Sequence, residues 1–186
     1  MKEGGRLGPV TVAATDLTAR LDHLREAPTE VGTLALVVRR PAARARELLD
    51  EADGLVGDNW LSRATSRAIA AGRHLEAQVT VMSARMAGLL ADDPAGQALA
   101  GDQLYVDLDL SHANLPAGSR LAIGDTAVIE VSAKPHNGCK KFLARFGDDA
   151  VAFVNSEIGQ AMRLRGLNAR IVTGGVVRPG DVVRKV

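Results

Sequence analysis

The chain has 186 residues, and its 23 Lys and Arg against 22 Asp and Glu leave a formal net charge of +1. This balance, together with only 3% aromatic residues, argues against a basic surface that binds nucleic acid and stacks its bases. The single cysteine rules out an internal disulfide framework, and no apolar stretch has the length of a signal peptide or a membrane span, so we expect one cytoplasmic domain over 1–186 without nucleic-acid or membrane partners.

The first half of the chain predicts one strand between two helices. Residues 1–31 form an N-terminal extension with a predicted helix over Leu17–Arg25. The apolar run Gly32–Val38 is typical of a buried strand. A proline at an early helical position, apolar residues at helical spacing and the stop signal Gly54 predict a helix over Pro41–Ala52.

The second half is dominated by short strands. Runs rich in β-branched residues predict strands over residues 78–83, 103–110, 127–133, 169–173 and 182–186, with helices over 84–91, 139–146 and 149–156. Three strands follow a Gly-Asp pair, at Gly101-Asp102, Gly124-Asp125 and Gly180-Asp181, which indicates repeated tight turns into strands. The pattern predicts a mainly β fold with peripheral helices, a β-barrel or strongly bent sheet, rather than a parallel sheet with crossover helices.

Cys139 lies at the start of a predicted amphipathic helix, with Asn137 or Gly138 as its N-cap. The positive end of the helix dipole, the neighbouring lysines Lys140 and Lys141, and His136 three residues earlier should lower the pKa of the thiol. We therefore expect a partly exposed thiol that alkylates faster than a free one near neutral pH. The alternative is a buried structural cysteine on the same helical face as Phe142, Leu143 and Phe146.

Other kinds of site have weaker signals. No Cys-x-x-Cys or His-Glu-x-x-His motif indicates zinc, and no glycine-rich phosphate loop is present. A Cys–His–acid arrangement of Cys139 with His74 or His136 and Asp58 or Asp102 would have to be assembled in space. An anion pocket is better supported, because guanidinium groups suit phosphate and carboxylate. The candidate cations, each of which can also be an ordinary surface charge, are Arg63, Arg67, Arg73, His74, Arg85, Lys140, Lys141, Arg145, Arg163 and Arg165.

The chain resembles the MOSC domain family, named for the C-terminal domain of molybdenum cofactor sulfurase, from about Gly32 to its end. The resemblance depends on short segments that occur in the family's order, among them residues 54–60, 73–85, 101–111, 114–116, 129–142, 145–147, 163–166 and 180–183. It implies a bent, largely antiparallel barrel of the pyruvate-kinase-barrel type with helices around it. It also implies that Cys139 carries sulfur or ligates the molybdenum of a bound pterin cofactor.

From this resemblance we expect one cleft that binds the molybdenum cofactor (molybdopterin), with Cys139 as the thiolate ligand or persulfide carrier. The predicted lining comprises His74, Arg85, His136, Lys140, Asp58, Asn59 and Asn155. In the competing arrangement, His74 and Arg85 pair with acidic groups such as Asp102 or Glu76.

Three functions follow from the resemblance and its alternatives. The first is a molybdenum-dependent protein, such as a reductase of N-hydroxylated compounds with a redox partner. The second is a sulfur carrier supplied by a cysteine desulfurase. The third is a non-enzymatic small-molecule binder whose cysteine is buried. Pyridoxal phosphate binding belongs to the desulfurase half of the fused enzymes, and no lysine motif here supports it.

Overall fold

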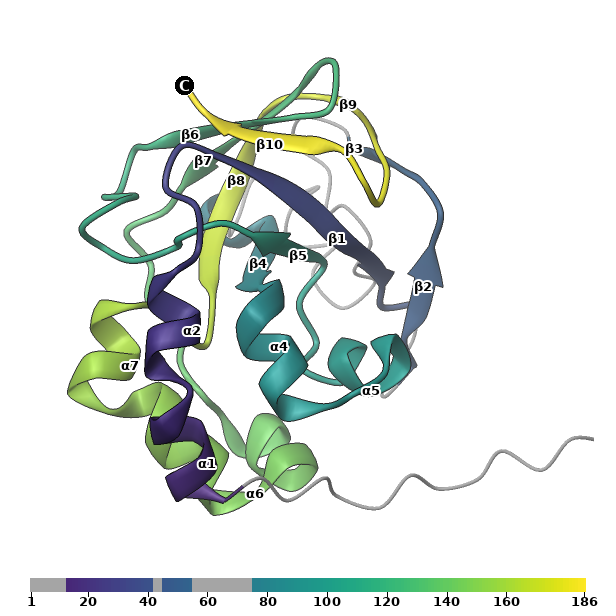
Figure 1. Cartoon of the computed structure of the whole chain (residues 1–186). Coiled ribbons are helices and arrows are strands. Elements are labelled where there is room, and N and C mark those ends of the chain that lie inside the picture. The colour runs from purple at the N-terminus through teal and green to yellow at the C-terminus, as the bar shows by residue number, and fades with distance from the viewer. Residues whose placement is uncertain (1–12, 42–44, 55–74) are drawn as a thin grey trace, which may run out of the picture.

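A closed β-barrel forms the core of the computed structural model, which describes residues 13–41, 45–54 and 75–186 (Figure 1). Among these residues, seven strands follow one another around the barrel in the order β10-β6-β7-β8-β4-β5-β1, and β1 pairs with β10 to close it. Neighbouring strands are antiparallel, except that β4 and β5 run parallel. The barrel strands are β1 (Val31–Arg39), β4 (Val79–Ser83), β5 (Leu104–Asp107), β6 (Arg120–Ile123), β7 (Ala127–Val131), β8 (Leu167–Thr173) and β10 (Val182–Lys185).

The alternation of buried and exposed side chains along the strands explains why they enclose an apolar interior. In β7, Ala127, Ile129 and Val131 are buried while the residues between them are partly exposed, as expected for a strand with one covered face. Leu34 and Val183 contribute to the same interior cluster from the two strands that close the barrel. The shortest strands lie outside it: β2 (Glu47–Leu49) pairs with β1, and β3 (Ala52–Gly54) pairs with β9 (Gly175–Val177).

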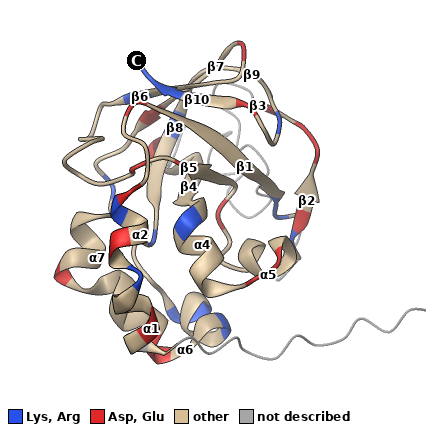
Figure 2. Ribbon diagram, viewed as in Figure 1, with Lys and Arg blue, Asp and Glu red and all other residues tan. Residues whose placement is uncertain are grey.

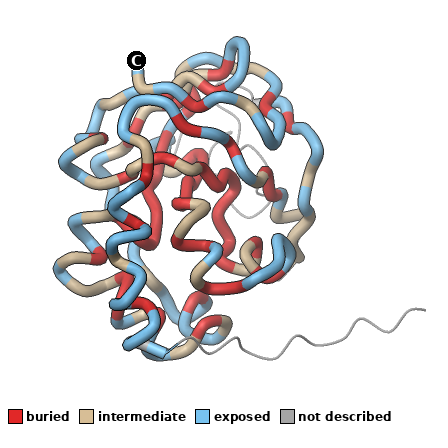
Figure 3. The backbone as a smooth tube through the Cα atoms, in the orientation of Figure 1, coloured by how far each residue is buried: buried red, intermediate tan, exposed pale blue. Residues whose placement is uncertain are grey.

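The helices gather at one end of the barrel, the lower end in Figure 1. The helices contribute to a second apolar cluster, which includes Leu17, Met86, Phe142 and Phe146. Buried backbone is concentrated on β4 and β5 in the middle of the molecule (Figure 3), whereas charged residues of both signs are scattered over the outer elements (Figure 2). The helices are α1 (Ala14–Ala19), α2 (Leu21–Arg25), α4 (Ala84–Leu90), α5 (Pro94–Ala98), α6 (Lys140–Asn155) and α7 (Glu157–Ala161), with a 3₁₀ turn at Leu75–Ala77.

No helix in the described part of the chain has both the length and the apolar character needed to cross a bilayer.

The predicted mainly β fold with peripheral helices is confirmed, as are the five strands of the second half and the strand near Gly32–Val38. All three Gly-Asp pairs precede strands, and Gly101, Gly124 and Gly180 have positive φ. The two helices predicted after Cys139 form one element, α6, which is kinked at Gly147.

The helix predicted over Pro41–Ala52 is wrong. Its described part contains β2 and the start of β3, because Leu48 and Leu49 pair with Val38 and Val37 of β1. The helical spacing of its apolar residues is real, but pairing with a long neighbouring strand overrides it. The sequence prediction also missed β6, β9, α5 and α7, which are all five residues long or shorter.

Gly166, directly before β8, provides a test of the close contact between this segment and β4. Its φ is 102°, and a methyl group added here would lie 2.3 Å from the carbonyl oxygen of Val81. Because that carbonyl belongs to a paired strand and cannot move aside easily, Gly166→Ala is expected to lower the free energy of unfolding by about 3 kcal/mol or more. Urea unfolding measures this change.

Gly118→Ala is the matched control. Gly118 has a similar φ of 91°, but nothing lies within 4 Å of the added methyl group. The substitution should therefore cost only the strain of the left-handed backbone, about 1–2 kcal/mol. Equal losses in the two variants would show that the contact with Val81 contributes nothing.

Candidate functional site

Cys139 is the N-cap residue of α6, and its side chain is exposed. Partial burial raises the pKa of the thiol, but the backbone N–H groups of Phe142 and Lys141 and the charges of Arg165 and Lys141 outweigh burial. The pKa of Cys139 therefore lies below its usual value. The predicted position at a helix N-terminus is confirmed, although Cys139 itself is the cap rather than Asn137 or Gly138. The alternative of a buried structural cysteine is wrong.

Asparagine side chains hold the loop that leads to the thiol. Asn155 Oδ1 accepts a hydrogen bond from the Gly138 N–H at 2.8 Å, and Asn155 Nδ2 donates to the Gly138 carbonyl at 3.2 Å. Asn168 Nδ2 donates to the carbonyls of Lys134 and Pro135, at 3.2 and 3.1 Å. The start of α6 is therefore fixed both to its own C-terminal end and to β8.

Beneath this loop, Asp102 connects His136 to Arg165. The Asp102 carboxylate is fully buried; one oxygen lies 2.8 Å from His136 Nε2, and the other accepts a hydrogen bond from Arg165 Nη1 at 2.5 Å. Arg165 also donates to the Ala100 carbonyl at 3.0 Å and lies over the Phe142 ring, with its Cζ 5.0 Å from the ring centroid. Burial alone would raise the pKa of Asp102, but the charges and hydrogen bonds of Arg165 and His136 together lower it to about 2.

Three more arginines lie close to Asp102 and to its neighbour Gly101. A methyl group added at Gly101 would lie 3.0 Å from Arg46 Nη2 and 3.3 Å from Arg145 Nη1, so both guanidinium groups pack against this glycine. Arg40 Nη2 donates to the Gln103 side-chain oxygen at 3.1 Å, and Arg145 donates to the Leu99 carbonyl. Residues from the segment directly after β1, the segment before β2, α6 and the segment before β8 thus converge beside Gly101 and Asp102. We call Arg40, Arg46, Arg145 and Arg165 the arginine cluster.

The arginine cluster is crowded and poorly solvated. Burial, and then the neighbouring guanidinium charge of Arg145, lower the pKa of Arg46 to about 10. The pKa of Arg40 and of Arg145 is lowered as well, first by burial, while the Cys139 thiolate acts in the opposite direction on Arg145. The buried Nε atoms of Arg40, Arg46 and Arg165 have no hydrogen-bond partner among the residues that the structure describes.

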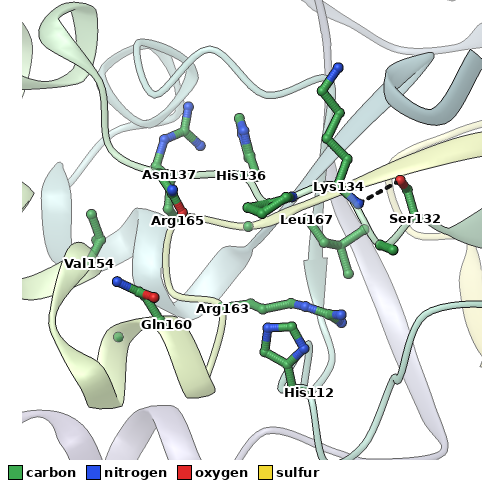
Figure 4. A pocket seen from close by; sticks show the side chains of 14 residues that line it. His112, Ser132, Lys134, His136, Asn137, Val154, Gln160, Arg163, Arg165 and Leu167 are labelled. Carbon is green, nitrogen blue, oxygen red and sulfur yellow. Dashed lines mark hydrogen bonds between the residues drawn. The ribbon is translucent and has the colours of Figure 1, made fainter. Parts of the chain in front are cut away.

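A small pocket of about 130 Å³ lies against the loop, and residues 132–137 form part of its wall. His136 and Arg165 lie at one side of it, and Arg163 and His112 lie at the other (Figure 4). Every ionisable side chain that the described structure places in its wall is basic, and Lys134 is the fifth of these. The wall of this pocket therefore carries the positive charges of Lys134, Arg163 and Arg165.

The structure brings together some of the predicted site residues. His136, Cys139, Lys140 and Asn155 belong to one loop-and-helix unit, although both polar atoms of the Asn155 side chain are engaged by Gly138. His74, Asp58 and Asn59 lie outside the described residues. Of the conceivable Cys–His–acid arrangement, the pair of His136 and Asp102 is present, but no hydrogen bond between described residues joins His136 to the thiol.

Arg85 is engaged elsewhere. Its Nε donates to Asp107 Oδ1 at 2.6 Å, and its Nη1 donates to the His23 carbonyl at 2.9 Å, which ties α4 to β5 and α2. Arg85 does not line the pocket beside His136. An acidic partner for Arg85 was one of the expected arrangements, but the partner is Asp107 rather than Asp102 or Glu76.

Arg40 and Arg46 were missed. The sequence shows two basic pairs, Arg39-Arg40 and Arg44 with Arg46, directly after a buried strand, and this was the available signal. It was obscured because the segment was assigned to a helix whose polar face would carry such charges.

The family is decided by a comparison with domain models. The model of the MOSC domain matches residues 73–184, which is more than half of the chain. The chain belongs to the MOSC domain family. The predicted resemblance is thereby confirmed, and Cys139 and Arg165 lie inside the matched region.

Solved structures share the MOSC fold of this chain. The YuaD protein of Bacillus subtilis aligns with a TM-score of 0.55 and 15% identity, over 82% of this chain and 94% of that one. YiiM from Geobacillus stearothermophilus aligns with a TM-score of 0.57 and 15% identity, over 84% of this chain and 75% of that one. At this identity the likeness concerns the fold alone. A search of curated proteins finds no match.

Proposed function

We propose that this MOSC protein binds the anionic molybdenum cofactor to which its family is linked, with the Cys139 thiolate as the protein's ligand to the metal. The observation that carries the proposal is an exposed thiol of lowered pKa beside a cluster of guanidinium groups, three of which have an N–H donor without a partner among the described residues. A thiolate is a soft ligand, and arginine binds phosphate through paired hydrogen bonds.

The residues present fit such a cofactor in two respects. Cys139 lies at the start of a helix that favours its ionised form, so the ligand atom is available as a thiolate without a separate base. The arginine cluster offers N–H donors that the described part of the chain leaves unused. The chemistry supplied by bound molybdenum is two-electron reduction, of which the reduction of N-hydroxylated compounds is the case that the resemblance implies.

The second candidate is a persulfide carrier, favoured by the exposure of Cys139 at the edge of α6. An exposed thiolate can be reached by a partner cysteine desulfurase, and the helix N-terminus would stabilise the negative charge of a persulfide as well. This function uses the same thiol but needs no metal.

Retention of molybdenum, measured in wild type and in Cys139→Ser, distinguishes these two functions. After expression in a host that makes the cofactor, we expect the wild-type protein to retain molybdenum, measured by mass spectrometry of the metal, and Cys139→Ser to retain at least tenfold less. Circular dichroism and urea unfolding should show that the variant is folded. Arg120→Gln, which removes a charge from an exposed ion pair with Glu130 outside the candidate site, is the control and should keep the metal.

A wild-type protein without molybdenum would refute the first candidate. Incubation with a desulfurase and cysteine should then add one sulfur atom to the mass of wild type but not of Cys139→Ser. Absence of both results would overturn the proposed function as a whole.

A further inference from the structure

His136 is held at the wall of the pocket by a carboxylate that stays ionised. Its Nε2 lies 2.8 Å from Oδ1 of Asp102, whose side chain is fully buried and whose other oxygen accepts a hydrogen bond from Arg165. Burial raises the pKa of Asp102, but the charges and hydrogen bonds of Arg165 and His136 lower it to about 2. Near neutral pH the carboxylate therefore only accepts hydrogen bonds, so Nε2 of His136 carries a proton. In the neutral imidazole, Nδ1 is then left with the lone pair.

The other nitrogen of this ring is available to the pocket. His136 is part of the pocket wall (Figure 4), its side chain is 19% exposed, and no hydrogen bond between described residues involves Nδ1. The backbone before the ring is fixed, because Asn168 Nδ2 donates to the carbonyl of Pro135. A histidine with one ring nitrogen held by a carboxylate and the other open to a cavity is arranged to exchange a proton with a bound molecule.

The rest of the wall suits a small ring. Apolar walls with a few polar groups among them are typical of sites that bind small molecules. The apolar and amide side chains of this wall are those of Ala133, Pro135, Val154, Leu167, Asn137 and Gln160. An engineered cavity of about 150 Å³ in another protein holds benzene, so the pocket of about 130 Å³, which opens to solvent, has room for a molecule with one ring.

The charges around the pocket favour a ligand that has given up a proton. Arg163 has no ion-pair partner among the described residues, although two backbone carbonyls accept hydrogen bonds from its Nη1. Its charge acts within the pocket, since burial and then Arg163 lower the pKa of His112 on the same wall. Lys134 and Arg165 also line the pocket, and each is paired with one carboxylate. No described carboxylate lines the pocket itself, so the conjugate base of a weak acid is stabilised there.

We infer that this pocket binds a single-ring molecule with an acidic O–H or N–H group, and that His136 takes up its proton. The O–H or N–H bond of the ligand breaks, its electron pair stays on the ligand as the conjugate base, and a new N–H bond forms at Nδ1 of His136. No electron is transferred, so the step needs neither a metal nor a redox partner. The inference goes beyond the proposed function, because neither Cys139 nor a cofactor takes part in this step.

4-Nitrophenol is the probe, because only its ionised form absorbs visible light strongly and so reports where its proton is. Absorbance at pH 6, with metal-free protein titrated into the probe, gives both the affinity and the ionised fraction. We expect saturable binding and an ionised fraction about fivefold that of the free probe, because a positive charge a few ångströms away lowers the pKa of an acid by about 1 or more. His136→Gln should reduce this gain to less than about twofold, since the amide N–H can still donate to Asp102 and hold the loop but cannot take up a proton.

His23→Gln is the matched control, because it removes an exposed histidine of α2 that does not line the pocket. It should change the affinity and the ionised fraction by less than about twofold, since charges beyond a Debye length are screened. ¹⁵N NMR of wild type with labelled histidine is a second measurement, which remains informative if His136→Gln fails to fold. Nε2 of His136 should carry the proton in the free protein, and Nδ1 should gain one when the probe saturates the pocket.

Four results would overturn the inference: no binding, an unchanged ionised fraction, an equal gain in His136→Gln, or a free protein in which only Nδ1 of His136 is protonated. The protein in these experiments contains no metal. None of these results therefore affects molybdenum retention, by which the proposed function is tested.

Discussion

Replacing Arg165 with methionine is expected to lower the free energy of unfolding by about 3–5 kcal/mol. The substitution keeps most of the side-chain volume but leaves the fully buried Asp102 with His136 as its only ion-pair partner among the described residues. An uncompensated charge out of water is among the most destabilising changes that one substitution makes. The substitution also removes the contact of the Arg165 guanidinium with the Phe142 ring and its hydrogen bond to the Ala100 carbonyl.

Urea unfolding at pH 7 measures this loss, and Arg85→Met is its control. Arg85 forms an ion pair of similar length with Asp107, at 2.6 Å, but its partner's side chain is 40% exposed. Breaking such a solvated pair should cost only about 1 kcal/mol or less. The double variant Asp102→Asn with Arg165→Met should recover part of the stability, because it removes both charges. Equal costs for Arg165→Met and Arg85→Met would contradict the special role of burial.

The same ion pair should make the fold sensitive to acid. Folding lowers the pKa of Asp102 from 3.8 to about 2, so the ionised carboxylate favours the folded state. That contribution, about 2 kcal/mol, is present above pH 4 and is lost as the pH falls toward 2. Asp102→Asn should therefore show a smaller loss of stability between pH 4 and pH 2 than wild type. Parallel curves for the two proteins would show that Asp102 does not titrate as expected.

The barrel could be predicted from local signals in the second half of the chain. Each Gly-Asp pair combines a glycine of positive φ with a turn-forming aspartate directly before a strand, so sequence and structure agree there. Between Pro41 and Ala52 the outcome depends on β1, whose nine residues supply a partner for Leu48 and Leu49. Helical spacing within a segment contains no information about such a partner.

Part of the candidate site could likewise be predicted from local signals, and the rest depends on long-range strand pairing. Cys139 and His136 could be found because they share one short segment with structure-breaking residues and lysines. Arg40 and Asp102 come together only through the pairing of β1 with β5, which lie far apart in the sequence. The sequence indicates Asp102 as a turn residue and as a possible acidic partner of a histidine or of Arg85, but its role as the buried partner of Arg165 depends on that long-range contact.

Cys139 is expected to react with iodoacetamide faster in the folded protein than in the unfolded one near pH 7. Backbone N–H groups at the start of α6 and the charges of Arg165 and Lys141 favour the thiolate over the thiol, which more than offsets partial burial. Each unit by which the pKa falls below about 8.5 raises the thiolate fraction at pH 7 about tenfold. Lower intrinsic nucleophilicity reduces this to a gain in rate of about threefold.

The rate of alkylation between pH 5 and pH 9, followed by mass spectrometry, gives the midpoint directly. It should lie below that of the same protein in urea, where the helix and the arginine cluster no longer act on the thiol. Lys141→Gln should move the midpoint upward, because Lys141 lowers the pKa of the thiol through its charge. Lys140→Gln, the same change one residue earlier, should move it less. A thiol that reacts only after unfolding would be inaccessible in the fold, and neither a metal nor a sulfur donor could then reach it.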